Sequence, residues 1–397
     1  MDGRYILGID IGTSTIKVFI GTLDTNGNVL VAGSGTAPTV GFKKGIFSDP
    51  KLLALTIKQA VDCAVGATNI CVKDAYIGIS GIEIKAVNSL GSVTPLLTDQ
   101  ITQDDISRGK RAATFVAVTE DHEVLHVLPQ KFFVDKRRVE LPLQENGSHL
   151  EVQAHIVSIP KKTLNSLVNA IEELGINVVN VVVNSIVVTE NIKSTNSGNF
   201  LLMDIGAGTT ELTLYREGYI FLSASLPLGG DYITSDIMQG ISISWNHAEE
   251  IKKYYAKLDK QLRGQEITLD CNAYNTTDKH IPYDFLNDIV ESRVSEIIYL
   301  LSDYLKLSLE EIQIEKVFLT GGCGAMPSFI ECIGTTFGVP VEVIHPSDLS
   351  PEYSSPGNTA CYSIVKYAVK NLSKLQVAPG SNAWQRLMNR CNKFFKN

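Results

Sequence analysis

The sequence contains one internal repeat, and this repeat constrains the fold more than any other feature. Asp10–Val18 reads DIGTSTIKV, and Asp204–Leu212 reads DIGAGTTEL. In both copies apolar and β-branched residues flank a turn of small and hydroxyl residues, which is the pattern of a strand, a tight turn and a second strand. The spacing between the copies is far longer than a solenoid period of roughly 20–50 residues. The repeat therefore predicts a duplicated domain.

Each copy of the repeat opens a segment of mixed α/β character. The first hairpin is expected over Tyr5–Thr22, followed by a glycine-rich connection, a helix over Asp49–Val65 that starts with Asp-Pro, and the strand Ala75–Ser80. The second hairpin starts at Asn199 and is likewise followed by helices and a strand. Two related α/β halves are expected.

The residues between Gly81 and about Pro160 have a different character. They read as short strands around one polar helix, Asp104–Ala113, which is typical of a small α+β subdomain. The amphipathic pattern of Lys161–Leu174 then predicts a helix with which the α/β order resumes. The sequence thus predicts a subdomain inserted into the first half.

The charge is unevenly distributed along the chain. The net charge of −8 argues against binding of nucleic acid or of a membrane by the bulk electrostatics of the whole chain. The last acidic residue is Glu352, and the 45 residues that follow it carry seven Lys and Arg. An acidic body with a basic tail is expected.

Cysteine usage and hydropathy bear on the compartment. The seven cysteines are scattered and never spaced as C-x-x-C, so neither a disulfide framework nor a zinc site is indicated, and a reducing cytosol is expected. The N-terminus shows no signal-peptide pattern, and no apolar stretch reaches the roughly 18 residues of a transmembrane helix. We expect a soluble protein, or one that rests on a membrane surface.

The repeated motif has the chemistry of a phosphate site. Small residues in the turn let backbone N–H groups approach a phosphate, and the Asp at the strand end can hold a hydrated Mg²⁺. One copy alone often marks only a hairpin turn. Here two copies occur, with a third glycine-rich strand end at LTGGCGAMP, Leu319–Pro327. A nucleotide clasped between two related domains is the leading interpretation.

These three motifs resemble the phosphate-1, phosphate-2 and adenosine motifs of the actin, sugar-kinase and Hsp70 superfamily. Within it the chain is most similar to the FtsA family of actin-like bacterial cell-division proteins, through KKGIFSDPKLLALTIKQAV, EVLHVLPQKFFVD with LEVQAHIV, and PLGGDYITSDI with AEEIKKYY. The resemblance implies an α/β, actin-like (ribonuclease H-like, duplicated) ATPase fold with an inserted 1C-type subdomain and a C-terminal amphipathic helix. The implied division is 1–82, 161–198 and 346–376 as subdomain 1A; 83–160 as 1C (SHS2-like); 199–230 and 284–345 as 2A; 231–283 as 2B; 377–381 as linker; and 382–397 as membrane-targeting helix.

The resemblance also implies the roles of individual residues toward ATP and Mg²⁺. Asp10 and Asp204 would face Mg²⁺ through water. The other residues implied at the nucleotide are Gly12, Thr13, Ser14 and Lys17 at the β-phosphate, Gly206, Gly208 and Thr209 at the γ-phosphate, and Gly230, Glu249, Lys252, Gly321, Gly322 and Met326 toward ribose and adenine. From the residues alone, Lys17 could be a solvated strand residue, and Glu249 with Lys252 could be an ordinary charged helix face.

The sequence departs from the wider superfamily where the attacking water is oriented. Asn184 or Ser185 takes the place of a Gln or Glu, and Ala207 that of an acidic residue in actin. A short amide is a poor general base, so Asn184 is a weak catalytic candidate and ATP hydrolysis is expected to be slow or absent. No other base stands out, and the seven histidines show no metal-ligand spacing.

The last sixteen residues, NAWQRLMNRCNKFFKN, divide completely into two faces on a helical wheel. Pro379-Gly380 separates this segment from the body, and an interfacial helix would gain from burial of its aromatic side chains and from cations near anionic lipid. A helix docked on the body is the alternative. The residues expected at a membrane are Trp384, Arg386, Leu387, Met388, Arg390, Lys393, Phe394, Phe395 and Lys396.

The family resemblance implies a function and its partners. It implies an ATP-binding scaffold that polymerises on the cytoplasmic face of the cell membrane. This scaffold would bind the C-terminal tail of FtsZ and so tether FtsZ at the division septum. Further partners would be anionic lipid, other copies of the chain and other divisome proteins that meet the inserted subdomain, without nucleic acid. A PilM-like pilus-assembly protein is the alternative, and an Hsp70 or sugar-kinase type of ATPase is a more distant one.

Overall fold

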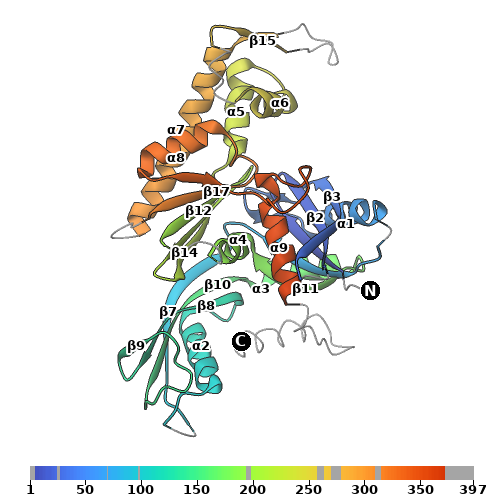
Figure 1. Cartoon of the computed structure of the whole chain (residues 1–397). Helices are drawn as coiled ribbons and strands as arrows, with labels where there is room; N and C mark the ends of the chain where they lie inside the picture. The colour runs from blue at the N-terminus through green and yellow to red at the C-terminus, as the bar shows by residue number, and fades with distance from the viewer. Residues whose placement is uncertain are drawn as a thin grey trace.

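The computed structural model describes residues 5–24, 27–68, 70–96, 99–193, 198–256, 263–269, 279–308 and 314–371. Figure 1 shows two halves built on separate sheets, with a third unit projecting away from them at the bottom of the view. The amphipathic segment expected at 382–397 lies outside the described residues.

The first half is built on a five-stranded sheet with the order β11-β6-β1-β2-β3. Strands β1, β2 and β3 are antiparallel, whereas β6 and β11 continue the sheet in parallel with β1. Side chains of β1 alternate between two cores: Leu7 and Ile9 pack on one face with α1, and Ile6 packs on the other with α9. The elements are β1 (Ile6–Ile11), β2 (Thr15–Leu23), β3 (Val29–Pro38), α1 (Pro50–Gly66), β6 (Asp74–Ile79), α3 (Lys161–Glu172), β11 (Asn177–Val183), α4 (Asn184–Lys193) and α9 (Thr359–Lys370).

The expectation of a glycine-rich connection after the first hairpin is wrong for residues Val29–Pro38, because they form strand β3 at the edge of the sheet. Its glycines are needed for close packing, since a Cβ at Gly35 would lie 2.1 Å from the Ala60 carbonyl oxygen of α1. Glycine in a strand can mark such a close backbone approach instead of a loop. A two-stranded hairpin, β4 (Phe42–Lys43) with β5 (Ile46–Phe47), then precedes α1.

The second half repeats this plan. Its sheet has the order β14-β13-β12-β17-β18, with β12 to β14 antiparallel and β17 and β18 parallel to β12. Because strand order and directions are the same in the two sheets, the predicted duplication is confirmed. The elements are β12 (Phe200–Ile205), β13 (Thr210–Arg216), β14 (Tyr219–Leu226), α5 (Gly230–Ile241), α6 (Trp245–Tyr255), β15 (Glu266–Leu269), β16 (Lys279–Pro282), α7 (Tyr283–Ser308), β17 (Lys316–Thr320), α8 (Pro327–Phe337) and β18 (Val341–Val343).

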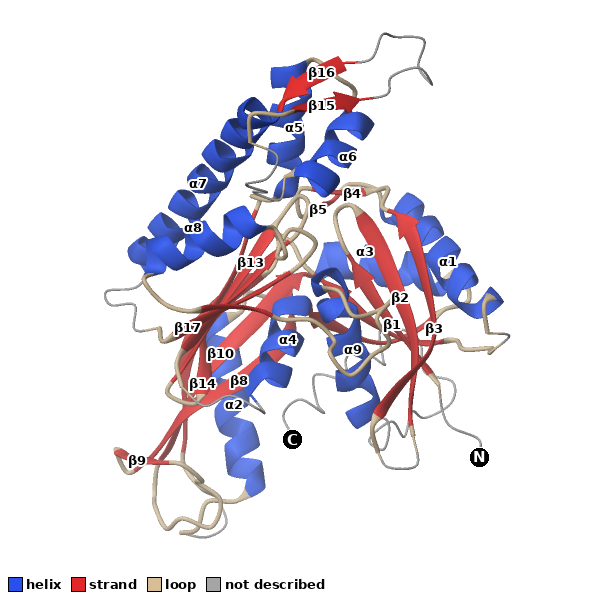
Figure 2. Cartoon of the chain, turned by 45° about the horizontal axis from the view of Figure 1, so that its top comes forward, coloured by secondary structure: helices blue, strands red, loops and turns tan. Residues whose placement is uncertain are grey.

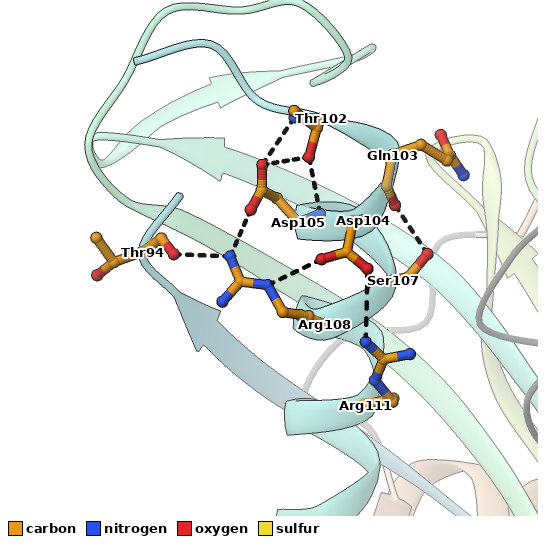
Figure 3. A network of polar contacts seen from close by, with 8 residues as sticks. All are labelled: Thr94, Thr102, Gln103, Asp104, Asp105, Ser107, Arg108 and Arg111. Atoms are coloured by element: carbon orange, nitrogen blue, oxygen red, sulfur yellow. Dashed lines mark hydrogen bonds and ion pairs between the residues drawn. The ribbon is translucent and has the colours of Figure 1, made fainter. Parts of the chain in front are cut away.

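The inserted unit is a four-stranded sheet, β7-β10-β8-β9, with helix α2 against it (Figure 2). Its elements are β7 (Lys85–Val93), α2 (Gln103–Ala117), β8 (His122–Val134), β9 (Arg137–Val139) and β10 (Leu150–Pro160). Helix α2 begins with a capping box, in which the side chains of Thr102 and Asp105 each bond the other's backbone N–H (Figure 3). In the part of the chain that the structure describes, no helix is long and apolar enough to span a bilayer.

Candidate nucleotide-binding cleft

A cavity of about 400 Å³ lies between the two halves, where the turns of both repeats meet. Residues of β1, β2 and the 3₁₀-helix before α9, Pro356–Asn358, line one side, and residues of β12, β13, α6 and the loop after β17 line the other. All residues that the sequence predicts at the nucleotide line this cavity, except Gly208 and Gly230. The catalytic candidate Asn184 lines it as well. The structure thus brings together motifs that are distant in the sequence.

The two repeat turns contact each other directly. The Gly208 N–H donates to the Thr13 hydroxyl oxygen over 2.8 Å, so Gly208 contributes to the site without lining the cavity. The Thr39 hydroxyl fixes the first turn by donating to the Gly12 carbonyl over 2.7 Å. The second turn is closed by the Gly206 N–H, which donates to the Thr209 carbonyl over 2.9 Å. These bonds present both turns toward the same space.

The buried carboxyl groups of Asp10 and Glu211 and the half-buried carboxyl group of Asp204 line the cavity together with Lys17. Burial raises the pKa of Asp10, although the charge of Lys17 and a hydrogen bond from Asn184 oppose the shift. Burial and the charge of Asp10 raise the pKa of Asp204 to about 7. Burial and the charge of Asp204 also raise the pKa of Glu211 well above its ordinary value. Without a cation nearby, these three carboxyl groups therefore hold their protons more tightly than exposed carboxyl groups do.

Glu211 is a site residue that the sequence analysis missed. It lines the cavity, and its Oε2 accepts the Ser185 N–H over 3.1 Å, whereas its Oε1 is buried with no hydrogen-bond partner in the structure. The repeat contained a signal, because Asp204 pairs with Glu211 across β12 and β13 as Asp10 pairs with Lys17 across β1 and β2. Glu211 is therefore a further polar candidate at the cavity, in addition to Asn184, which the sequence analysis named as a weak catalytic candidate.

Asn184 holds the side chain of Asp10 in place. It is the first residue of α4, and its Nδ2 donates to Asp10 Oδ1 over 2.7 Å. Its Oδ1 is buried without a hydrogen-bond partner, like Oε1 of Glu211. The amide nitrogen thus orients Asp10.

The opposite end of the cavity is built on α6. Lys252, whose side chain is only 5% exposed, pairs with Glu249 over 2.6 Å and donates to the Gly230 carbonyl over 3.2 Å and to the Thr234 hydroxyl over 2.8 Å. Burial acts to raise the pKa of Glu249, but the charges of Lys252 and Lys253 together with hydrogen bonds from Lys252 and Thr234 outweigh it, and the pKa is lowered. Glu249 and Lys252 are thus an internal ion pair and not a solvated helix face. Gly230 supports this pair from behind the cavity wall.

The floor of the cavity has the chemistry of a site for a hydrated cation. Two buried oxygens, Asn184 Oδ1 and Glu211 Oε1, have no hydrogen-bond partner, and burial raises the pKa values of the carboxyl groups, so a nearby cation would favour their charged forms. Among the described residues, no three His, Cys, Asp or Glu side chains are close enough to hold a metal ion directly. These residues therefore fit Mg²⁺ held through water better than Mg²⁺ held by direct ligation.

Comparison with known proteins identifies the family. A family model described as "Cell division protein FtsA" matches residues 201–363, and one described as "SHS2 domain inserted in FTSA" matches residues 81–158. The cell division protein FtsA of Pseudomonas aeruginosa is 30% identical over 349 residues, which cover 86% of this chain and 83% of that protein. The chain belongs to the FtsA family. The FtsA of Escherichia coli K12 is 22% identical over 361 residues, covering 88% of this chain and 86% of that protein.

Solved structures show the same fold. The "PilM-PilN type IV pilus biogenesis complex" aligns with a TM-score of 0.67 at 16% identity, covering 92% of this chain and 98% of that chain. MreB 5 of Spiroplasma citri bound to AMPPNP aligns with a TM-score of 0.54 at 14% identity, covering 94% and 97%. The predicted actin-like fold with an inserted SHS2 subdomain is confirmed.

Proposed function

We propose that the chain is an ATP-binding, actin-like scaffold that polymerises on the cytoplasmic face of the cell membrane and tethers FtsZ at the division septum. The observation that carries this proposal is the cleft between duplicated sheets, in a member of the FtsA family, where both repeat turns and the Glu249–Lys252 pair face one cavity. ATP would lie with its phosphates at the turns, and Asp10, Asp204 and Glu211 would hold the water shell of Mg²⁺. The positive charge of that ion would offset the carboxylates.

The membrane part of the proposal rests on the sequence of residues 382–397. A helix with Trp384, Phe394 and Phe395 on one face and four cations on the other gains about 1 kcal/mol per Lys or Arg near anionic lipid. This energy adds to the burial of the aromatic side chains. Filament formation on the membrane would multiply the attachment, because each copy brings its own helix.

Sedimentation with vesicles of anionic lipid tests the tether. We expect the full chain to sediment with the vesicles and a chain ending at Gly380 to stay in the supernatant. Lys393→Glu with Lys396→Glu should abolish sedimentation, whereas Lys51→Glu with Lys58→Glu, on α1, should not. Equal sedimentation of the full and shortened chains would exclude the tether.

Electron microscopy on an anionic lipid monolayer tests assembly. Filaments should form with ATP and Mg²⁺ and be absent without nucleotide.

Binding of a peptide with the sequence of the FtsZ C-terminal tail, measured by fluorescence anisotropy, tests the interaction with FtsZ. The scaffold role would be ruled out if the chain binds ATP but forms no filaments and does not bind the FtsZ peptide.

A further inference from the structure

The first turn of α4 is the place where the first half, the second half and the inserted subdomain meet. Asn184 Nδ2 bonds Asp10 Oδ1 of the first half, and the Ser185 N–H bonds Glu211 Oε2 of the second half. The Val183 N–H, one residue earlier, donates to the ring Nε2 of His126 over 2.9 Å. His126 belongs to β8 of the inserted subdomain. Three neighbouring residues are therefore each held by a different part of the molecule.

His126 is suited to a fixed acceptor role. It is only 3% exposed, and burial together with the charge of His155 lowers its pKa to about 3, so the ring is neutral near pH 7. A neutral imidazole accepts at one nitrogen and carries its proton on the other, so the bond from Val183 requires the proton on Nδ1. The contact is therefore directional and does not depend on charge.

The strand that carries His126 is tied to the rest of the inserted sheet. His126 lies opposite Val157 in the β8–β10 pair, and His155 on β10 lies next to this pair. The ring nitrogens of His155 bond Asn88 Oδ1 on β7 over 2.7 Å and Ser223 Oγ on β14 of the second half over 2.8 Å. A displacement of the inserted sheet would therefore move His126 with it.

We propose that His126 is a positioning residue that couples the inserted subdomain to the nucleotide cavity. A shift of β8 moves the Val183 backbone, and with it the Asn184 amide that orients Asp10. A ligand that fixes Asp10 and Asn184 must in return bias the position of β8, because coupling between two sites is reciprocal. This inference rests on the proposed binding of ATP in the cavity.

Hydrogen–deuterium exchange of the full chain, with and without ATP and Mg²⁺, tests the coupling. ATP should slow amide exchange in β8 and β10 of the natural chain. His126→Leu keeps the bulk but removes the acceptor, so we expect it to abolish this response and to weaken ATP binding by about threefold to tenfold. His126→Gln, whose Oε1 can accept the Val183 N–H, should restore both. His149→Leu, at a partly exposed position of the same subdomain, should match the natural chain.

Several outcomes would overturn the coupling. If His126→Leu responds to ATP like the natural chain, or if His126→Gln behaves like His126→Leu, His126 does not act through its acceptor. In case His126→Leu fails to fold, ¹⁵N nuclear magnetic resonance of the natural chain provides a second measurement, since ATP with Mg²⁺ should shift the His126 Nε2 resonance. An unshifted resonance would also reject the coupling.

Calorimetry of the natural chain separates this inference from the proposed function. If ATP binds but exchange in β8 and β10 is unchanged, the coupling alone fails. If ATP does not bind, the proposed function fails and the coupling fails with it.

Discussion

The hydroxyl of Thr13 accepts a 2.8 Å hydrogen bond from the N–H of Gly208, which joins the turn of one repeat to the turn of the other across the cleft. Thr13→Val keeps the shape but removes the acceptor, so the closed position of the two halves should lose stability. We expect ATP binding, measured by calorimetry, to weaken by about threefold to tenfold. Thr13→Ser should bind like the natural chain, and Thr36→Val, at an exposed position of β3, is the control.

Lys44, at the tip of the β4–β5 hairpin, provides a second contact between the halves. Its Nζ lies 5.2 Å from the centre of the Tyr232 ring on α5, and the Arg293 guanidinium carbon lies 5.6 Å from the same centre. Such cation–π contacts contribute roughly 0.5–2 kcal/mol. Lys44→Ala should therefore speed the release of a fluorescent ATP analogue in stopped-flow experiments by about twofold to tenfold. Unchanged release, as expected for the control Lys51→Ala, would show that this contact does not hold the cleft closed.

Gly230 occupies a position where a side chain does not fit. A Cβ there would lie 2.3 Å from Cys323 Sγ and 3.2 Å from Lys252 Nζ. Overpacking of this kind costs about 1–3 kcal/mol, so Gly230→Ala should lower the melting temperature and weaken ATP binding. Gly66→Ala is the matched control, because no atom lies within 4 Å of its Cβ.

A double variant separates the steric effect at Gly230 from a general loss of folding. Cys323→Ala removes the sulfur atom that the new methyl group meets. Gly230→Ala should therefore be less harmful in the Cys323→Ala background than in the natural chain, in both melting temperature and ATP affinity. Additive effects of the two changes would contradict the steric explanation.

The sequence predicts the parts of the site that are made by local backbone. The turns at Gly12 and Gly206 and the strand ends at Asp10 and Asp204 could be predicted, because a tight turn after a strand needs small residues in a short stretch. Strand β3 could not be predicted, because its glycines are required by the close packing of helix α1 and not by the residues next to them in the sequence.

The residues that the sequence analysis missed act through tertiary contacts. Glu211 contacts Ser185 because α4 packs on β13, and His126 contacts Val183 because β8 packs on β11. No pattern in the neighbouring sequence predicts either of these contacts. Comparison of the two repeats was the one available signal, since Glu211 occupies the position of Lys17.

The raised pKa of Asp204 predicts a pH-dependent stability in the absence of nucleotide. The folded-state pKa is about 7 and the unfolded-state pKa about 4, so the folded chain holds the proton more tightly. The stabilisation from this group is present below pH 4 and is lost as pH rises through 7, and it amounts to at most about 4 kcal/mol. Thermal unfolding should show the stability of the natural chain falling relative to Asp204→Asn between pH 5 and pH 8. A constant difference over this range would contradict the assignment.

The capping box of α2 predicts a local effect in the inserted subdomain. Burial acts to raise the pKa of Asp105, but hydrogen bonds from Thr102 and the charge of Arg108 outweigh it and the pKa is lowered. Thr102→Ala removes the cap at a cost of about 0.5–2 kcal/mol, so amide exchange in α2 should quicken, whereas Thr102→Ser should keep it slow. Arg111→Ala should change little, because the pair of Arg111 with Asp104 is exposed and 3.9 Å long. Equal exchange in Thr102→Ala and the natural chain would mean that the Thr102 hydroxyl does not stabilise this helix.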